Sequence, residues 1–318
     1  MQRRGPDDDG VTTAQPRKFT FTTATGAVLA GYHWPAAAGQ EPRSDSATAE
    51  AGPAPGGGRA PLIMIHGFGE HARRHGALAQ AAAAAGHDVF GFDQEGHGES
   101  PGPRAVVAGF TSTRAAVAAL SDRAARQEGV GSGRAPPRPV LFGHSMGGLV
   151  ALDYALDRPD DLAALMLSAP ALRDAVERPA WLVKLASTIA RLAPTLPVVQ
   201  LDVKSISRDP AEVRRYADDP LIHHRGVPAV TGYTINSRGA ELLSRAGALR
   251  VPTLAVHGEA DKIMAVEGSR LLAAGAPRGM VELHTFPAAF HELHHDPPAS
   301  GVRERVLDVE RAFLAAYG

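Results

Sequence analysis

The chain has 318 residues, of which 44% are hydrophobic and 21% are charged, and its formal net charge is −1. This is an ordinary globular composition, and the near-neutral charge argues against binding to nucleic acid. Because cysteine is absent, disulfides, thiolate zinc sites and a cysteine nucleophile are excluded. The sequence shows no secretory signal and no apolar run of about 18 residues, so we expect a cytoplasmic protein with a small neutral or apolar substrate.

The N-terminal part is predicted to contain a tail, a hairpin and a loop. Residues 1–17 are polar and rich in Gly, Pro and Asp, which predicts a disordered tail. The β-type runs 19–23 and 28–32 flank a turn at Thr25-Gly26 and indicate a hairpin. Residues 36–60 are a low-complexity stretch of Ala, Gly, Pro and Ser, which predicts a flexible surface loop.

From residue 61 onward, short continuous apolar runs alternate with helical patterns. This alternation is typical of a mostly parallel sheet with both faces covered by helices. The expected strands are 62–65, 89–92, 140–142, 162–167, 253–256 and 281–286, and the expected helices are 77–85, 110–128, 149–156, 266–274 and 302–316. The sequence therefore predicts one α/β domain, residues 18–318, with its chemistry at the carboxyl ends of the strands.

The alternation is interrupted at about residues 171–240, where helical patterns follow one another without an intervening strand. We expect this segment to be a helical lid. Its residues 181–192 carry a one-sided apolar stripe at helical spacing, formed by Trp181, Leu182, Leu185, Ile189 and Leu192. The stripe packs against the sheet domain, lines an acyl-chain pocket, or makes transient contact with a membrane surface.

A candidate nucleophile lies in the pentapeptide Gly143-His144-Ser145-Met146-Gly147. A buried-strand pattern precedes it and a helical pattern follows, so it fits a tight strand-to-helix turn that carries a reactive serine and needs glycines for close packing. The hydroxyl of Ser145 needs a base to take its proton and a carboxylate to orient that base. On this type of turn, the acid and then the histidine follow the serine in the chain.

The predicted acid is Asp261, in the loop after the expected strand 253–256. Glu259 is a nearby competitor for this role. The predicted base is His291, which lies just past the last expected strand and 30 residues after Asp261. The order and the positions at strand ends favour this pair.

The base has its own competitors, because His294 and His295 follow His291 closely. Together with Asp296 these histidines could also form a metal site. Their spacing matches no metalloprotease helix motif, and the triad already uses His291, so we expect neither a metal nor a cofactor.

Acyl transfer through a serine also needs two backbone N–H groups that bind the oxyanion of the tetrahedral intermediate. One is expected from Met146, the residue after the nucleophile. The other is expected from Phe68, in the loop His66-Gly67-Phe68-Gly69 after the first parallel strand, where the glycines allow close backbone approach.

From about residue 61 to the C-terminus the chain resembles one branch of the α/β-hydrolase superfamily, the bacterial monoacylglycerol lipase and lysophospholipase-like enzymes. Several separated motifs carry the resemblance, and they are His66-Gly67-Phe68-Gly69-Glu70-His71 with Arg74, the run from Phe92 to Ser100, Gly143 to Gly148, Tyr216 to Leu221, and His257 to Asp261.

The resemblance implies the same triad and the same oxyanion amides. It also implies that Glu70, Arg74 and His294 help to bind the glycerol end of the leaving group. For Glu70 and Arg74, the alternative is an internal salt bridge that braces the loop. The sequence departs from the family at His75, where the family usually has Tyr, at the rim of the leaving-group site, and in the long stretch 36–60.

The implied function is that of a serine carboxylic-ester hydrolase, a monoacylglycerol lipase that releases a fatty acid and glycerol through an acyl-enzyme. A lysophospholipase or a short-chain carboxylesterase is the alternative within the hydrolases. A non-catalytic binding protein of the same fold and cofactor-independent perhydrolysis or C–C cleavage are the alternatives outside them. The sequence does not indicate an oligomeric state.

Overall fold

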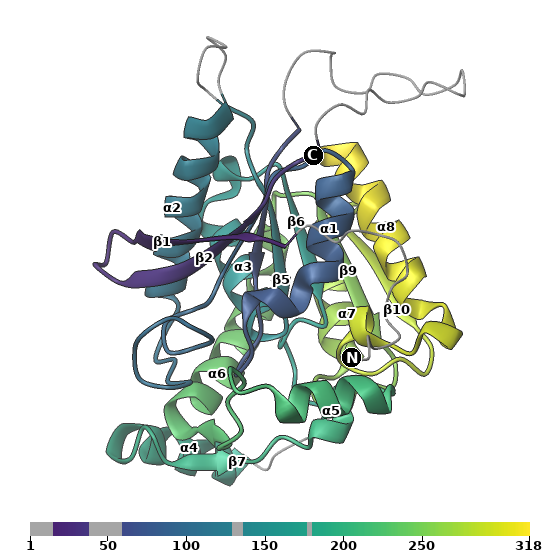
Figure 1. Ribbon diagram of the computed structural model, residues 1–318. Coiled ribbons are helices and arrows are strands. Elements are labelled where there is room, and N and C mark those ends of the chain that lie inside the picture. The colour runs from purple at the N-terminus through teal and green to yellow at the C-terminus, as the bar shows by residue number, and fades with distance from the viewer. Residues whose placement is uncertain (1–14, 38–58, 129–135, 177–179) are drawn as a thin grey trace, which may run out of the picture.

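Figure 1 shows the computed structural model, which describes residues 15–37, 59–128, 136–176 and 180–318. Most of the predicted tail and of the predicted loop 36–60 lies outside these residues. The boundary of the predicted tail is wrong at its last residue. Arg17 is the first residue of a strand and pairs with His33, so the pairing of the hairpin extends two residues before its first apolar residue, Phe19.

The described residues form an eight-stranded sheet in the order β1-β2-β4-β3-β5-β6-β9-β10. β2 pairs antiparallel with β1 and β4, and the other neighbours are parallel. The strands are β1 (Arg17–Thr22), β2 (Val28–Trp34), β3 (Leu62–Ile65), β4 (Val89–Phe92), β5 (Val140–His144), β6 (Ala164–Ser168), β9 (Thr253–Gly258) and β10 (Val281–Phe286). The hairpin and the mostly parallel sheet predicted from the sequence are confirmed.

The central strands form because every residue of β3, β4, β5 and β6 is buried, so both faces need apolar or small side chains. Three strands, β3, β4 and β10, have the predicted bounds. β6 begins two residues later than predicted, because residues 159–161 form a 3-10 turn whose end is capped by Leu162. A purely apolar run does not reveal such a turn.

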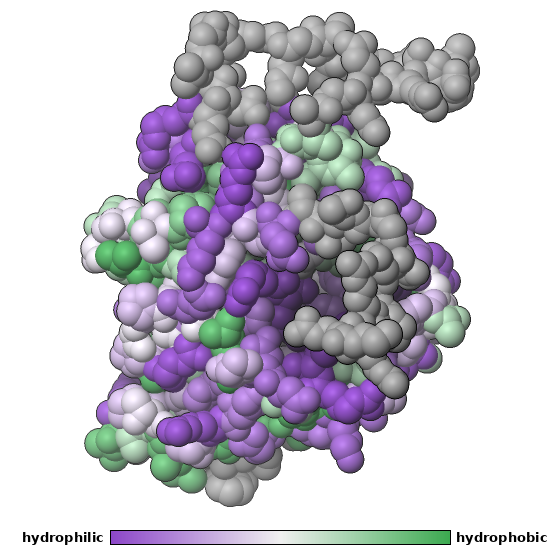
Figure 2. Space-filling model, viewed as in Figure 1, coloured by the Kyte–Doolittle hydropathy of each residue, from purple (hydrophilic) through white to green (hydrophobic). Residues whose placement is uncertain are grey.

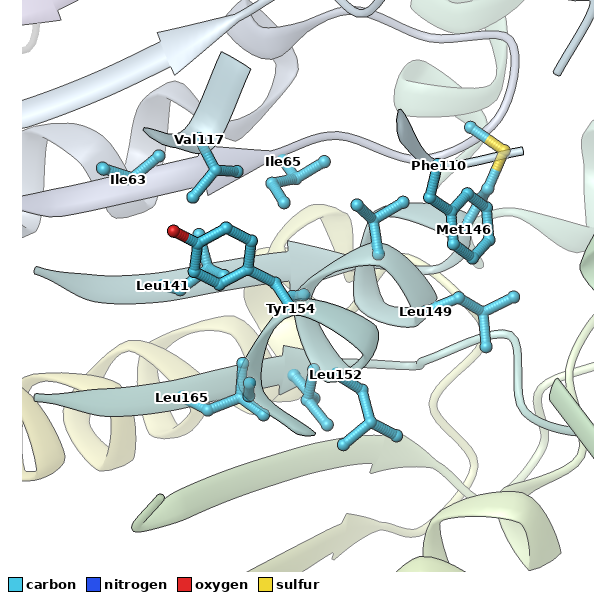
Figure 3. Close-up of a cluster of buried hydrophobic side chains, with 14 of the residues drawn as sticks. Ile63, Ile65, Phe110, Val117, Leu141, Met146, Leu149, Leu152, Tyr154 and Leu165 are labelled. Carbon is cyan, nitrogen blue, oxygen red and sulfur yellow. The ribbon is translucent and has the colours of Figure 1, made fainter. Parts of the chain in front are cut away.

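Helices cover both faces of the sheet, and alternate strand residues face each layer (Figure 1). On one side lie α1 (Gly76–Ala84) and α8 (Val302–Tyr317), and on the other lie α2 (Thr111–Glu128), α3 (Met146–Asp157) and α7 (Val266–Gly275). Figure 3 shows Leu149 and Leu152 of α3 within the same buried cluster as Leu141 of β5. Each fully buried leucine contributes about 1.5 to 3 kcal/mol, so α3 is held firmly on the sheet.

Between β6 and β9 the chain forms a cap segment, residues 171–244. It contains α4 (Ala180–Leu192), β7 (Pro197–Val199), α5 (Pro210–Asp218), β8 (Val227–Pro228) and α6 (Ala229–Ser244). Figure 1 shows α4, α5 and α6 grouped at one end of the sheet. The expectation of helices without a strand is wrong, because β7 pairs antiparallel with β8. Strands of three and two residues are too short to give a periodic signal.

In the described ranges, no helix has the length and apolar character needed to cross a membrane.

Candidate active site

Ser145 lies at the turn between β5 and α3, with a φ of 51°. This is a strained conformation for a residue with a side chain, and such strain is characteristic of functional turns. The flanking glycines make the turn possible. A Cβ on Gly147 would lie 2.3 Å from the carbonyl oxygen of Ile65, and one on Gly143 would lie 2.4 Å from the carbonyl oxygen of Gly147. The end of β3 therefore touches the start of α3.

Asp261 lies just after β9 and contacts the imidazole of His291. The distance from His291 Nδ1 to Asp261 Oδ2 is 2.6 Å, while Oδ1 accepts hydrogen bonds from the amides of Ile263 and Met264 at 2.8 and 3.0 Å. Burial alone would raise the pKa of Asp261, but His291 and the hydrogen bonds hold this pKa well below its ordinary value. The carboxyl group is therefore ionised.

His291 donates a hydrogen bond from Nδ1 to Asp261, which leaves Nε2 for a second partner. Burial lowers the pKa of His291, but the carboxylate of Asp261 outweighs burial, and the pKa is raised above its ordinary value. Ser145 and His291 line the same pocket, which has a volume of about 70 Å³. Within the described residues, Ser145 Oγ has no hydrogen-bond partner. The hydrogen bond from a catalytic serine to its histidine often tightens only when substrate binds.

The competing residues point elsewhere. Glu259 accepts from Thr285 Oγ1 at 2.8 Å and contacts Arg270. His295 contacts Glu292 at 2.8 Å, and Asp296 binds Arg208. The geometry therefore favours Asp261 over Glu259 as the acid of the triad. In the loop after His291, His295 and Asp296 each contact a different partner.

The two expected oxyanion donors are close to the nucleophile. Met146 is the first residue of α3, where an amide has no partner within its own helix. Phe68 and Gly67 line the pocket with Ser145, and a Cβ on Gly67 would lie 3.1 Å from Ser145 Cβ. In the described part of the chain, the amide of Phe68 has no acceptor. Both N–H groups are thus free to bind a developing oxyanion.

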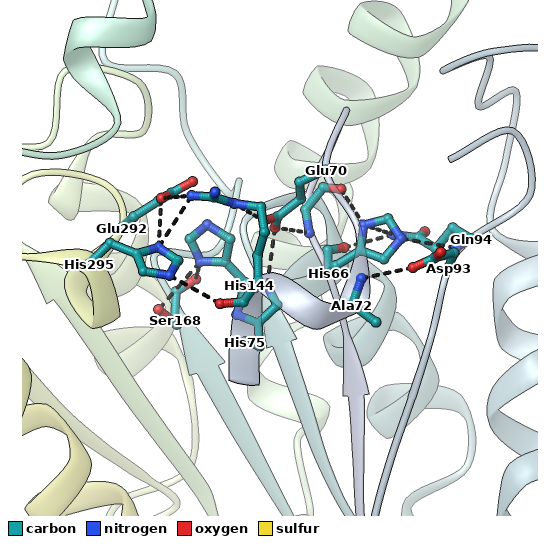
Figure 4. Close-up of polar contacts among 12 residues, drawn as sticks. His66, Glu70, Ala72, His75, Asp93, Gln94, His144, Ser168, Glu292 and His295 are labelled. Carbon is teal, nitrogen blue, oxygen red and sulfur yellow. Dashed lines mark hydrogen bonds and ion pairs between the residues drawn. The ribbon is translucent and has the colours of Figure 1, made fainter. Parts of the chain in front are cut away.

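A buried network of charges lies beside the pocket (Figure 4). Arg74 Nε is 3.3 Å from Glu70 Oε2, a contact of opposite charges without hydrogen-bond alignment, and Arg74 Nη2 donates to Glu292. The guanidinium also lies over the ring of Tyr216, 4.8 Å from its centre. His75 Nε2 is 3.1 Å from Glu70 Oε1. Burial alone would raise the pKa of Glu70, but its contacts with the His75 ring and the charge of Arg74 hold this pKa well below its ordinary value.

Four of the eight predicted site residues line one pocket, and they are Phe68, Glu70, Ser145 and His291. Asp261 and Met146 lie behind this wall, Asp261 in contact with His291 and Met146 directly after Ser145. Arg74 and His294 are not on this wall. His294 Nε2 lies 2.8 Å from Glu310 Oε2 of α8, and both side chains are buried. For Glu70 and Arg74, the internal salt bridge that we considered as the alternative is present.

Sequence reasoning missed three residues at the site. Glu292 lines the pocket and pairs with Arg74. Tyr216 lines the pocket beneath the guanidinium, and His257 Nε2 lies 3.2 Å from Asp261 Oδ2. Two of them belong to the motifs that carry the resemblance, and Glu292 directly follows the predicted base. Their positions in or next to these motifs were therefore the only sequence features that could have marked these three residues as part of the site.

The sheet, the helices on both of its faces and a serine on a strained strand-to-helix turn define the chain as an α/β-hydrolase. A family model described as Hydrolase_4, serine aminopeptidase S33, matches residues 57–298. The chain belongs to this family.

Named relatives define the branch. A monoacylglycerol lipase of Mycolicibacterium smegmatis is 34% identical over 260 residues, which is 81% of this chain and 89% of that protein. The crystal structure of Paleococcus ferrophilus monoacylglycerol lipase is similar with a TM-score of 0.71 and 31% identity, covering 82% of this chain and 97% of that one.

The fold is also that of a soluble variant of the Saccharomyces cerevisiae monoglyceride lipase, solved with a substrate analogue. That comparison has a TM-score of 0.78 and 22% identity, and it covers 98% of both chains. The chain is therefore a serine ester hydrolase of the monoacylglycerol lipase-like branch, and the resemblance found in the sequence is confirmed.

Proposed function

We propose that the chain hydrolyses monoacylglycerols with Ser145 as nucleophile, His291 as base and Asp261 as the acid that orients His291. The observation that carries this proposal is the 2.6 Å contact of His291 with Asp261 beside the pocket that Ser145 also lines. The two similar monoacylglycerol lipases, from Mycolicibacterium smegmatis and Paleococcus ferrophilus, support the substrate class.

The reaction has two steps. Ser145 Oγ attacks the ester carbonyl while His291 Nε2 takes the hydroxyl proton, and the same proton then passes to the glycerol oxygen as the ester bond breaks. Water then attacks the acyl-enzyme, with its proton going to His291, and the fatty acid leaves as Ser145 regains its proton. The amides of Phe68 and Met146 bind the oxyanion in both steps. No step requires a metal or a cofactor.

The leaving group is placed near Glu70. This carboxylate lies on the pocket wall and is ionised, so it can accept a hydrogen bond from a glycerol hydroxyl. In our proposal, Arg74 contributes by holding Glu70 and Glu292 in place. His294 contributes by tying the loop of His291 to α8.

The cap segment is proposed to act as a lid. The pocket at Ser145 holds about 70 Å³, whereas pockets for small ligands usually hold about 300 to 1,000 Å³. An apolar groove of about 840 Å³ lies between α4, α6, β7 and α7, and Ile189, Val198 and Tyr233 are on its wall. Movement of the cap would admit an acyl chain, and transient contact of the exposed apolar cap with a membrane surface would deliver it. A cytoplasmic location stays a prediction.

The test is Ser145→Ala. Its kcat on a monoacylglycerol should fall by as much as about a millionfold, while the protein keeps its melting temperature, because the variant removes the nucleophile and no packing. A fluorophosphonate probe should label the native protein and not the variant. An S145A protein that keeps more than about a tenth of the native activity would remove Ser145 from this role.

A substrate panel separates the candidate activities. Monoacylglycerols should be better substrates than lysophosphatidylcholine, compared by kcat/KM, because Glu70 is a suitable acceptor for a glycerol hydroxyl and would repel a phosphate group. Nitrophenyl esters of increasing chain length measure the acyl-chain preference separately. A clear preference for lysophosphatidylcholine would contradict the monoacylglycerol assignment and leave the ester hydrolase mechanism intact.

A further inference from the structure

The peptide that joins Gly67 to Phe68 is held from the side opposite to the pocket. A trans peptide is planar, so its C=O and N–H groups point in opposite directions, and fixing the carbonyl of Gly67 also fixes the amide of Phe68. His66 Nδ1 lies 2.7 Å from the carbonyl oxygen of Gly67. The direction of a predicted oxyanion donor therefore depends on a contact of the histidine just before it.

The hydrogen on His66 can be assigned from its partners. The backbone amide of Gln94, which can only donate, lies 2.9 Å from His66 Nε2, so Nε2 is the acceptor. Burial lowers the pKa of His66 to about 4, so the ring is neutral near pH 7. Its single N–H is then at Nδ1 and donates to Gly67.

The contact is braced on both sides (Figure 4). Gln94 Nε2 donates to the carbonyl oxygen of His66 at 2.7 Å, and Thr113 Oγ1 donates to Gln94 Oε1 at 3.1 Å. On the other side of the loop, Glu70 Oε1 accepts from the amide of Gly67 at 2.5 Å. His66 is buried, and it does not line the pocket at Ser145. Its contacts therefore act on the loop and not on a substrate.

We propose that His66 is a positioning residue that, as the Nδ1–H tautomer imposed by Gln94, aims the amide of Phe68 at the oxyanion. This inference rests on the proposed function, in which that amide binds the oxyanion. The oxyanion exists in the transition state and not in the bound ester, so the effect of His66 falls on kcat rather than on KM.

Two substitutions separate the roles of the two ring nitrogens. His66→Asn keeps a donor at the δ position, which can reach Gly67, and loses the acceptor at the ε position. His66→Gln keeps an acceptor for the Gln94 amide and loses the δ donor. We expect H66Q to lose about tenfold to a hundredfold in kcat with KM little changed, since loss of a whole oxyanion donor costs about a hundredfold to a thousandfold. H66N should stay within about threefold of the native kcat.

The measurements are kcat and KM on a nitrophenyl ester, the melting temperature, and the Ki of a trifluoromethyl ketone, whose adduct with serine carries an oxyanion. The Ki should rise for H66Q in parallel with the loss in kcat. Equal losses in H66N and H66Q, losses that follow the melting temperature, or a change confined to KM would overturn the inference. Ester hydrolysis by S145A would instead reject the proposed function. If S145A is inactive and H66Q is as active as the native protein, the proposed function stands and only the role of His66 fails.

Discussion

Arg74 is a buried cation between two buried carboxylates, those of Glu70 and Glu292. Burial lowers the pKa of Arg74, but the two carboxylates outweigh burial and raise it above its ordinary value. The pKa values of both carboxyl groups are held below their ordinary values, in part by this guanidinium. One guanidinium thus faces two carboxylates that are buried from water, so both carboxylates depend on Arg74 for their stabilisation.

Removing this cation should be costly. Arg74→Leu leaves two buried carboxylates without their partner, and we expect it to lower the free energy of unfolding by about 3 to 5 kcal/mol in urea denaturation. The control is Arg158→Leu, since Arg158 is 62% exposed in its pair with Asp161 and should cost less than about 1 kcal/mol. Equal losses in the free energy of unfolding for R74L and R158L would show that the buried ion pairs stabilise the protein no more than an exposed pair does.

The raised pKa of His291 sets the pH dependence of activity. The base must be neutral, so kcat/KM should fall as the pH drops through a value above 6.5, the ordinary histidine pKa. Asp261→Asn removes the charge that raises this pKa, so the acidic limb should move to lower pH and kcat should drop by about ten-thousandfold. Rate profiles from pH 5 to 9 check both points. An acidic limb that stays in place in D261N would contradict the assignment.

The residues of the site were predictable to different degrees. Ser145, Asp261 and His291 follow strands that are clear in the sequence, and their order is fixed by the fold. The salt bridge of Arg74 with Glu70 was anticipated, but the pairing of Arg74 with Glu292 and of His294 with Glu310 was not. These partners lie 218 and 16 residues apart in the chain, and a pairing between separate elements leaves no local pattern. The tautomer of His66 likewise depends on an amide 28 residues away.

At the scale of elements, the turn between β5 and α3 depends on close contact with β3. Gly147 faces the carbonyl oxygens of Ile65 and His66, and there is no room for even one added carbon. The strain at Ser145 is maintained because β5 and α3 are fully packed on both sides of the turn. The packing of these elements therefore fixes the position of the nucleophile.

Gly147→Ala should therefore disturb both stability and activity. The added Cβ would lie 2.3 Å from a backbone oxygen, so we expect a loss of about 1 to 3 kcal/mol or more and a large drop in kcat. Gly76→Ala is the matched control. Gly76 is helical, with φ −57°, and has nothing within 4 Å of the new carbon, so it should gain about 0.4 to 1 kcal/mol. A neutral G147A, by melting temperature and kcat, would contradict this packing argument.

Elements were predictable where a run of four to six residues, at least half of them apolar, is bounded by loop residues, as in β3, β4 and β10, because such a run is too short for a helix. The cap segment was less predictable. Its helix α4 was anticipated. The strands β7 and β8 have only three and two residues, and β7 is largely exposed to solvent. They pair across 27 intervening residues. Local pattern carries little information about such contacts.

At the scale of the whole molecule, large apolar side chains are exposed on and around the cap. They include Leu185, Leu192, Leu196 and Val198 (45%, 82%, 49% and 44% exposed). Figure 2 shows hydrophobic surface at the edge where Figure 1 places α4. Of the predicted stripe on α4, Ile189 lines the apolar groove and Leu185 and Leu192 are exposed, whereas the side chains of Trp181 and Leu182 lie outside the described residues.

The double substitution Leu192→Ser with Leu196→Ser should weaken binding to phosphatidylcholine vesicles, measured by flotation, because apolar area buried in the interface drives such binding. Each side chain contributes about 1.5 to 3 kcal/mol if fully buried, so a tenfold or greater loss in partitioning is expected. Val28→Ser on β2 is the control, since Val28 is 48% exposed but lies outside the cap. Unchanged vesicle binding of the double variant would rule out the cap as the contact surface.

The link between His294 and Glu310 has a consequence for the last turns of the chain. Glu310 is fully buried in α8, and its partner is three residues from His291. A premature stop between His294 and Glu310 would spare Ser145, Asp261 and His291. It would nevertheless remove the partner of the His294 imidazole and loosen the loop next to the base. Such a shortened polypeptide would retain its catalytic groups but lack their alignment.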